Sequence, residues 1–293
     1  MNNYLAFLLV VSIWSTTPLA IQFSTLGSSF NFGVASRMLL GLIICVLLLL
    51  IKAQSLTTTK LAISNYIYAG LGVFITMSLV YYSAQFIPSG IISVVFGLTP
   101  IMTGIFAMLL LKEAFYKPHK VLGLIMGILG LLVIFNHSLK FESHMLLGLI
   151  AVTLGMIFQA FVAVKLKQIN AHISALETTT GALLVSVPLF LISFTFTDGQ
   201  LPELITQKAL LSIIYLAIFG SVIGFMSYYY LIRHSSVKTV GIVPLITPIF
   251  ALIIGAYFNN ETLTLMQLNG IGLVLLGLVI YEYGSKKLWI KSE

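Results

Sequence analysis

The sequence predicts an all-α integral membrane protein whose ten transmembrane helices form two inverted five-helix repeats around a central cavity. Three observations predict it: an apolar composition, an internal repeat and a one-sided distribution of basic residues. Of the 293 residues, 59% are hydrophobic and only 8% are charged, and the mean hydropathy is +1.08. A soluble domain carries about 25% charged residues. The chain therefore has too little polar surface for water, and the bilayer is its solvent.

Ten apolar runs are long enough to cross a membrane, which takes about 20 mostly apolar residues. They are residues 4–23, 31–51, 62–86, 88–111, 119–136, 145–164, 175–196, 209–232, 237–258 and 266–284. The first run counts as a helix because a cleavable signal peptide has a shorter apolar core of roughly 7–15 residues. The connections are short and carry turn formers such as Pro88-Ser89-Gly90 and Asp198-Gly199. They leave no room for an inserted soluble domain.

Two stretches of the chain repeat each other. Tyr81-Tyr82, Thr99-Pro100 and Glu113 recur at the same spacing as Tyr229-Tyr230, Thr247-Pro248 and Glu261. Each stretch belongs to a five-span half, residues 1–140 and 141–293, and an odd number of spans makes the second half enter the membrane from the opposite side. Inverted repeats of this kind place a substrate site between the halves, near the bilayer midplane.

The basic residues fix the expected orientation. With the N-terminus in the cytoplasm, two of the fifteen Lys and Arg residues (Lys140 and Lys208) fall in outer loops, and Arg37 falls inside a span. The other twelve lie at cytoplasmic helix ends: Lys52, Lys60, Lys112, Lys117, Lys120, Lys165, Lys167, Arg233, Lys238, Lys286, Lys287 and Lys291. An excess of cytoplasmic Lys and Arg sets membrane topology. Both termini are therefore predicted to be cytoplasmic, and the net charge of +7 indicates headgroup contacts rather than nucleic-acid binding.

Several motifs together resemble the drug/metabolite transporter superfamily, in particular its EamA-type members with ten helices. They are Ile13-Trp14-Ser15-Thr16-Thr17-Pro18, Ser36-Arg37-Met38, the Thr-Pro pairs at 99–100 and 247–248, the acidic residues Glu113 and Glu261, and the glycine-spaced helices five and ten. The resemblance covers essentially the whole chain. It implies transport of small molecules across the bacterial inner (plasma) membrane, often export of amino acids, other metabolites or drugs.

We therefore expect a secondary transporter that exports amino acids or related zwitterionic or neutral solutes by alternating access. A lipid flippase and a drug efflux carrier are the alternatives. The chain has no H-E-x-x-H zinc motif and no G-x-x-x-x-G-K-[ST] phosphate loop, which argues against an enzyme or an ATP-driven pump. The expected partners are a small-molecule substrate, the lipid bilayer and, alternatively, a second copy of the chain. No cofactor and no metal are expected.

Arg37 is the basic residue placed well inside a span, where a charge is costly and indicates function by default. Its planar guanidinium suits a carboxylate. Alternatively, it is a structural or gating residue that bonds carbonyl groups of neighbouring helices or snorkels to the outer headgroups, since it lies about six residues from the outer end of its span.

Prolines and polar or aromatic residues complete the candidate site. A proline inside a helix frees a carbonyl group one turn earlier, and such groups in membranes face protein or a water-filled cavity. Paired prolines in the two halves therefore indicate a shared cavity or hinge. The candidate hinge or cavity residues are Pro18, Pro100, Pro244 and Pro248. The candidate substrate-binding residues are Trp14, Thr17, Arg37, Tyr81, Tyr82, Phe96, Thr99, Gln159, Tyr229 and Thr247.

Two further patterns bear on mechanism. None of the eight Asp and Glu residues falls near the centre of a span, and all five histidines lie in loops or at helix ends. Because proton relays normally use intramembrane Asp, Glu or His, proton exchange through a buried acid is disfavoured, although Glu177 or Glu282 could still titrate. The glycines at 123, 127 and 130 and at 270, 272 and 277 are expected to let helices approach closely, between the halves or in a dimer.

Overall fold

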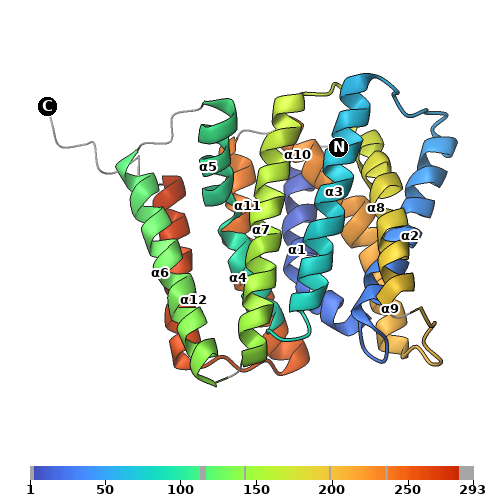
Figure 1. Cartoon of the computed structure of the whole chain (residues 1–293). Helices are drawn as coiled ribbons and strands as arrows, with labels where there is room; N and C mark the ends of the chain where they lie inside the picture. The colour runs from blue at the N-terminus through green and yellow to red at the C-terminus, as the bar shows by residue number, and fades with distance from the viewer. Residues whose placement is uncertain (1–2, 113–116, 142, 198, 235–236, 284–293) are drawn as a thin grey trace, which may run out of the picture.

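The computed structural model describes residues 3–112, 117–141, 143–197, 199–234 and 237–283, which form a bundle of helices (Figure 1). The helices are α1 (Asn3–Ser24), α2 (Phe30–Ile51), α3 (Lys60–Ser83), α4 (Ser89–Gly97), α5 (Thr99–Leu111), α6 (Pro118–Phe141), α7 (Ser143–Ile169), α8 (Ala175–Thr197), α9 (Gln207–Tyr215), the π-helix η1 (Leu216–Ile223), α10 (Gly224–His234), α11 (Val237–Asn259) and α12 (Leu265–Tyr283). The part of the chain that the structure describes contains no β-strand.

Eight helices in the described ranges are long and apolar enough to span a membrane. One of them joins α4 and α5, and another joins α9, η1 and most of α10. Two shorter apolar segments, Pro118–Ile134 and Ile246–Asn259, occupy the remaining predicted spans. Each apolar run of the sequence thus corresponds to a helical segment, which confirms the predicted all-α membrane fold.

Most large helix contacts join a helix of the first half of the chain to a helix of the second half. The long pairs are α6 with α12, α3 with α7 and α8, α2 with α8 and η1, α1 with α11 and α10, and α4 and α5 with α11 and α7. If the first five spans exchanged places with the last five, each of these pairs would map onto itself or onto another of them. In Figure 1, α1 begins at the upper end of the bundle and α7 begins at the lower end. Both features are what an inverted repeat requires.

The two ends of the bundle differ in charge. Asn3, at the start of α1, donates a hydrogen bond to the carbonyl oxygen of His234 at the end of α10 (3.1 Å), and α12 also ends at this upper end (Figure 1). Basic residues within the described ranges gather here, at 52, 60, 112, 117, 120, 165, 167, 233 and 238, whereas 140 and 208 lie at the lower ends of α6 and α9. Basic residues are therefore concentrated at the end where the described chain begins and ends.

The duplicated Thr-Pro motif has different effects in the two halves. In the first half the helix ends at Gly97 and a new one begins at Thr99. In the second half α11 runs without interruption through Pro244 and Pro248. Each proline removes one backbone donor, and spanning helices tolerate that loss because their neighbours compensate. Here α1 and α4 pack against α11.

Glycines bring α6 and α12 into backbone contact, as the sequence predicted. A Cβ atom on Gly277 would lie 2.8 Å from the carbonyl oxygen of Gly123, and one on Gly270 would lie 2.8 Å from that of Gly130. In reverse the distances are shorter, 2.5 Å from a Cβ on Gly123 to the Gly277 oxygen and 2.6 Å from a Cβ on Gly130 to the Gly270 oxygen. Gly272 is different, because a Cβ there would meet no atom within 4 Å. The close contact joins a helix of the first half to a helix of the second.

Candidate functional site

The π-helix η1 lies in the middle of the Gln207–His234 run and brings two halves of the protein together. A π-helix has a widened turn and often occurs at functional sites. Its small residues let α2 approach, since a Cβ on Gly41 of α2 would lie 3.1 Å from the Cβ of Ser221. Small residues at helix contacts are a common means of tight packing in membranes. η1 therefore presents its Gly220-Ser221 step directly to α2.

Arg37 packs against this step. Its side chain is 1% exposed, and its Nε donates a hydrogen bond to the hydroxyl oxygen of Ser221 (2.9 Å). A Cβ on Gly220 would lie 2.7 Å from Nη2 of Arg37, so the missing side chain at Gly220 makes room for the guanidinium. The other terminal nitrogen, Nη1, is buried and has no hydrogen-bond partner.

The guanidinium lies deep in the bundle. Ser221 is the fifteenth of the 28 residues between Gln207 and His234, so it lies at the middle of that run. Arg37 starts only seven residues from the lower end of α2, yet its side chain bonds to this central residue instead of reaching the surface. The alternative in which Arg37 snorkels to the headgroups is therefore wrong. The guanidinium stays in the bundle because Gly220 leaves room for it and the Ser221 hydroxyl accepts its hydrogen bond.

α1 packs against α9 and α10, the helices that flank η1. The ring of Trp14 lies 4.8 Å from the ring of Tyr228, and its Nε1 lies 3.7 Å from the position that a Cβ on Gly224 would take. Thr16 shares a 2.5 Å hydrogen bond with the hydroxyl of Tyr215. Trp14, beside the start of α10, and Arg37, beside η1, thus contact neighbouring turns of the Gln207–His234 run.

The other candidates on α1 and α10 differ in what they contact. Thr17 donates its hydroxyl hydrogen to the carbonyl oxygen of Ile13 within the same helix (2.7 Å), and Pro18 is buried. Tyr229 is half-buried, and its ring lies 5.8 Å from that of Tyr228. Tyr229 therefore joins the Trp14 group through its neighbour.

A second group forms where α4 meets α11. A Cβ on Gly97 would lie 3.4 Å from the carbonyl oxygen of Pro244 and 3.5 Å from Cγ of Pro248. Thr99, beside Pro100 at the α4–α5 junction, donates its hydroxyl hydrogen to the carbonyl oxygen of Phe96 (2.5 Å). Thr247 is buried beside Pro248. Gly97, three residues before Pro100, therefore lies against the two prolines of α11.

Within the described residues, no hydrogen bond or ring contact joins the other three candidates to either group. Tyr81 is completely buried, its hydroxyl has no hydrogen-bond partner, and it lies beside Gly33 of α2. The ring of Tyr82 contacts the rings of Phe30 and Phe86. Gln159 is half-buried on α7. The sequence did not single out Gly220 and Ser221, because two small residues in an apolar run carry no signal of a π-turn.

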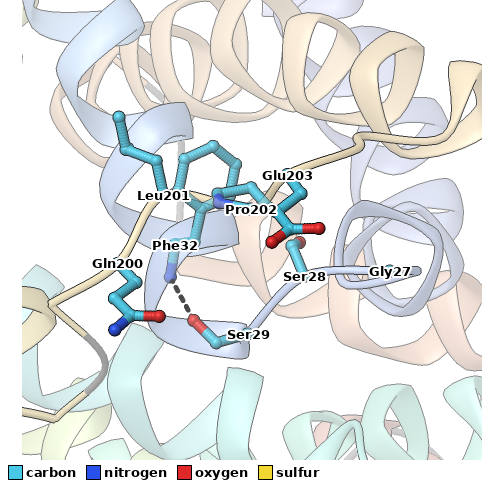
Figure 2. A pocket seen from close by; sticks show the side chains of 8 residues that line it. All are labelled: Gly27, Ser28, Ser29, Phe32, Gln200, Leu201, Pro202 and Glu203. Atoms are coloured by element: carbon cyan, nitrogen blue, oxygen red, sulfur yellow. Dashed lines mark hydrogen bonds between the residues drawn. The ribbon is translucent and has the colours of Figure 1, made fainter.

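A pocket of about 570 Å³ lies at the lower end, between the α1–α2 and α8–α9 connections (Figure 2). It is lined by Gly27, Ser28, Ser29, Phe32, Gln200, Leu201, Pro202 and Glu203. The Ser28 hydroxyl has no hydrogen-bond partner, whereas Ser29 accepts a hydrogen bond from the Phe32 backbone N–H (3.1 Å) and caps α2. None of the predicted site residues lines this pocket.

Comparisons with known proteins agree on one family. The EamA-like transporter family matches residues 1–136 and again 146–282. A protein of Archaeoglobus fulgidus described as an uncharacterized transporter is 28% identical over 96% of this chain and 98% of its own length. The uncharacterized inner membrane transporter YedA of Escherichia coli K12 is 26% identical over 69% of this chain and 64% of its own length.

A solved structure supports the same fold. A crystal structure of a protein that is 16% identical superposes with a TM-score of 0.68 and covers 95% of both chains. At that identity the likeness concerns the fold alone. The multi-pass helical architecture is thus shared along nearly the whole chain.

Proposed function

Because the chain belongs to the EamA-like transporter family, we propose that it is a secondary transporter that exports small metabolites, such as amino acids and related zwitterionic or neutral solutes, across the plasma membrane by alternating access. One observation carries the proposal. Arg37 of the first half bonds to Ser221 of the second half at the middle of a membrane-spanning run. Substrate sites of inverted-repeat transporters lie at the midplane between the repeats.

The packing supports two inverted repeats, residues 1–140 and 141–293. Helix pairs persist when the first five spans are exchanged with the last five, and the family matches the chain once in each half. The contact between Gly97 and the α11 prolines, Pro244 and Pro248, adds a second crossing between the halves. Rocking of one half against the other around a central site is the usual form of alternating access in such proteins.

The acidic residues support a carrier without a mid-membrane proton relay. Glu177 is engaged at the start of α8, where it accepts hydrogen bonds from Thr57 and Ser174. Glu261 lies in the connection before α12. Neither carboxylate is close to the middle of a span, where a relay would need it. Transport driven by the solute's own gradient fits this arrangement better than exchange for protons.

Metabolite profiling tests the proposal. Cells that produce the protein are compared with cells that carry an empty vector, and solutes inside and outside are measured by mass spectrometry. We expect a small set of metabolites to move outward in the producing cells. A change confined to lipid asymmetry would support a flippase instead, and a gain in drug resistance without a metabolite change would support a drug efflux carrier.

A further inference from the structure

The guanidinium of Arg37 has unused binding capacity in the middle of the protein. Nε is occupied by Ser221, whereas Nη1 is buried without a hydrogen-bond partner. A guanidinium offers five donors in a rigid fork, and a buried charge without a counterion is expensive. Such a group destabilises the folded protein unless a ligand that binds reversibly pairs with it.

No carboxylate in the described part of the chain is available as that partner. Glu177 bonds Thr57 and Ser174, and Glu261 bonds Ser89 and Gly90. Both are held at the ends of the bundle, far along the chain from the central step at Ser221. Glu203 lines the pocket at the lower end, and Glu282 lies in the last turn of α12 at the opposite end, near Lys120. The described residues therefore supply no counterion for Nη1.

We propose that the transported solutes carry a carboxylate and that Nη1 of Arg37 binds it. This inference rests on the proposed transport function. Ser221 acts as a positioning residue, because its hydroxyl holds Nε and so fixes the plane of the guanidinium. The remainder of the solute lies toward Trp14 and Tyr228, which pack on the next turn beyond η1. Nη1 is covered in the present conformation, so the carboxylate reaches it when η1 and α2 separate during the transport cycle.

Export of the cell's own metabolites is the first test. Mass spectrometry should find that every solute exported by the wild type bears a carboxylate, and that Arg37→Lys lowers their export at least about tenfold, because a lysine cannot reproduce the fork. Lys60→Gln removes a positive charge at the exposed start of α3 and should export like the wild type. Exported solutes without carboxylates, or an Arg37→Lys variant that exports normally, would overturn the inference and leave the transporter standing. No exported solute at all would remove the proposed function and this inference together.

Stability of the purified protein is the second test, and it separates ligand binding from a structural role. Arg37→Met keeps most of the side-chain volume and removes the uncompensated charge. We expect its melting temperature without solute to equal or exceed that of the wild type, while its export falls to background. A melting temperature clearly below that of the wild type would mean that the guanidinium stabilises the empty protein, which contradicts the inference.

Discussion

The carboxylate of Glu261, in the connection before α12, accepts a hydrogen bond from the backbone N–H of Ser89 at the first turn of α4 (3.1 Å). The N–H of Gly90 donates to the same carboxylate (3.3 Å). Asn259 donates to both Glu261 and Gln22 of α1. The first N–H groups of a helix have no partner within it, and a carboxylate there also interacts favourably with the helix dipole. Glu261 thus ties the two halves together at the lower end.

Removing this carboxylate should weaken the lower end. Glu261→Ala leaves two N–H groups of α4 without acceptors, and we expect a loss of about 1–3 kcal/mol in unfolding free energy. Glu261→Gln keeps one acceptor oxygen and should lose less. Unfolding in detergent measures both, and Glu203→Ala on the exposed α8–α9 connection serves as the control. Equal stability of Glu261→Ala and wild type would mean that this contact does not hold the halves together.

The distribution of basic residues predicts that the upper end is cytoplasmic. A reporter fused after Lys291 should be read as inside, and one inserted beside Gly199 should be read as outside. Alkaline phosphatase, active outside, and a fluorescent protein, fluorescent inside, give opposite signals at the two positions. Both reporters on one side would contradict the inverted-repeat proposal.

The α6–α12 contact should be sensitive to single methyl groups. Gly270→Ala and Gly277→Ala place a Cβ 2.8 Å from a carbonyl oxygen of α6, and overpacking of this kind costs about 1–3 kcal/mol. Gly272→Ala is the matched control, because its Cβ meets nothing within 4 Å and alanine favours a helix by about 0.5–1 kcal/mol over glycine. Melting curves of the three variants should separate the first two from the third.

Pro100, at the start of α5, and Pro248, at the α4–α11 contact, should affect turnover more than binding. Pro100→Ala and Pro248→Ala each restore a backbone donor to their helix and should stiffen the region where the halves meet. We expect kcat for the exported solute to fall more than KM changes. Pro202→Ala, in the α8–α9 connection, is the control. A change in KM alone would assign these prolines to the binding surface instead of a hinge.

Much of the candidate site follows from local sequence, but its assembly does not. The glycines at 123, 130, 270 and 277 were predicted to bring helices together, and the structure confirms it. All the candidate site residues remain predictions, and within the described residues no hydrogen bond or ring contact joins Tyr81, Tyr82 or Gln159 to Arg37. Glu113, the repeat partner of Glu261, lies outside the described residues. For an equivalent of the contact between Glu261 and α4, the sequence repeat at Glu113 is therefore the available indication.

The sequence by itself determined that the protein lies in a bilayer, where its helices run and at which helix ends its basic residues gather. Hydropathy, helix length and basic residues at helix ends can each be read from short stretches of the chain. Tertiary structure alone decided where the guanidinium of Arg37 lies. From the sequence it stood near the outer end of its span, where long basic side chains commonly reach the headgroups. A glycine and a serine on a π-turn 184 residues away leave it the space and the hydrogen bond to stay in the middle.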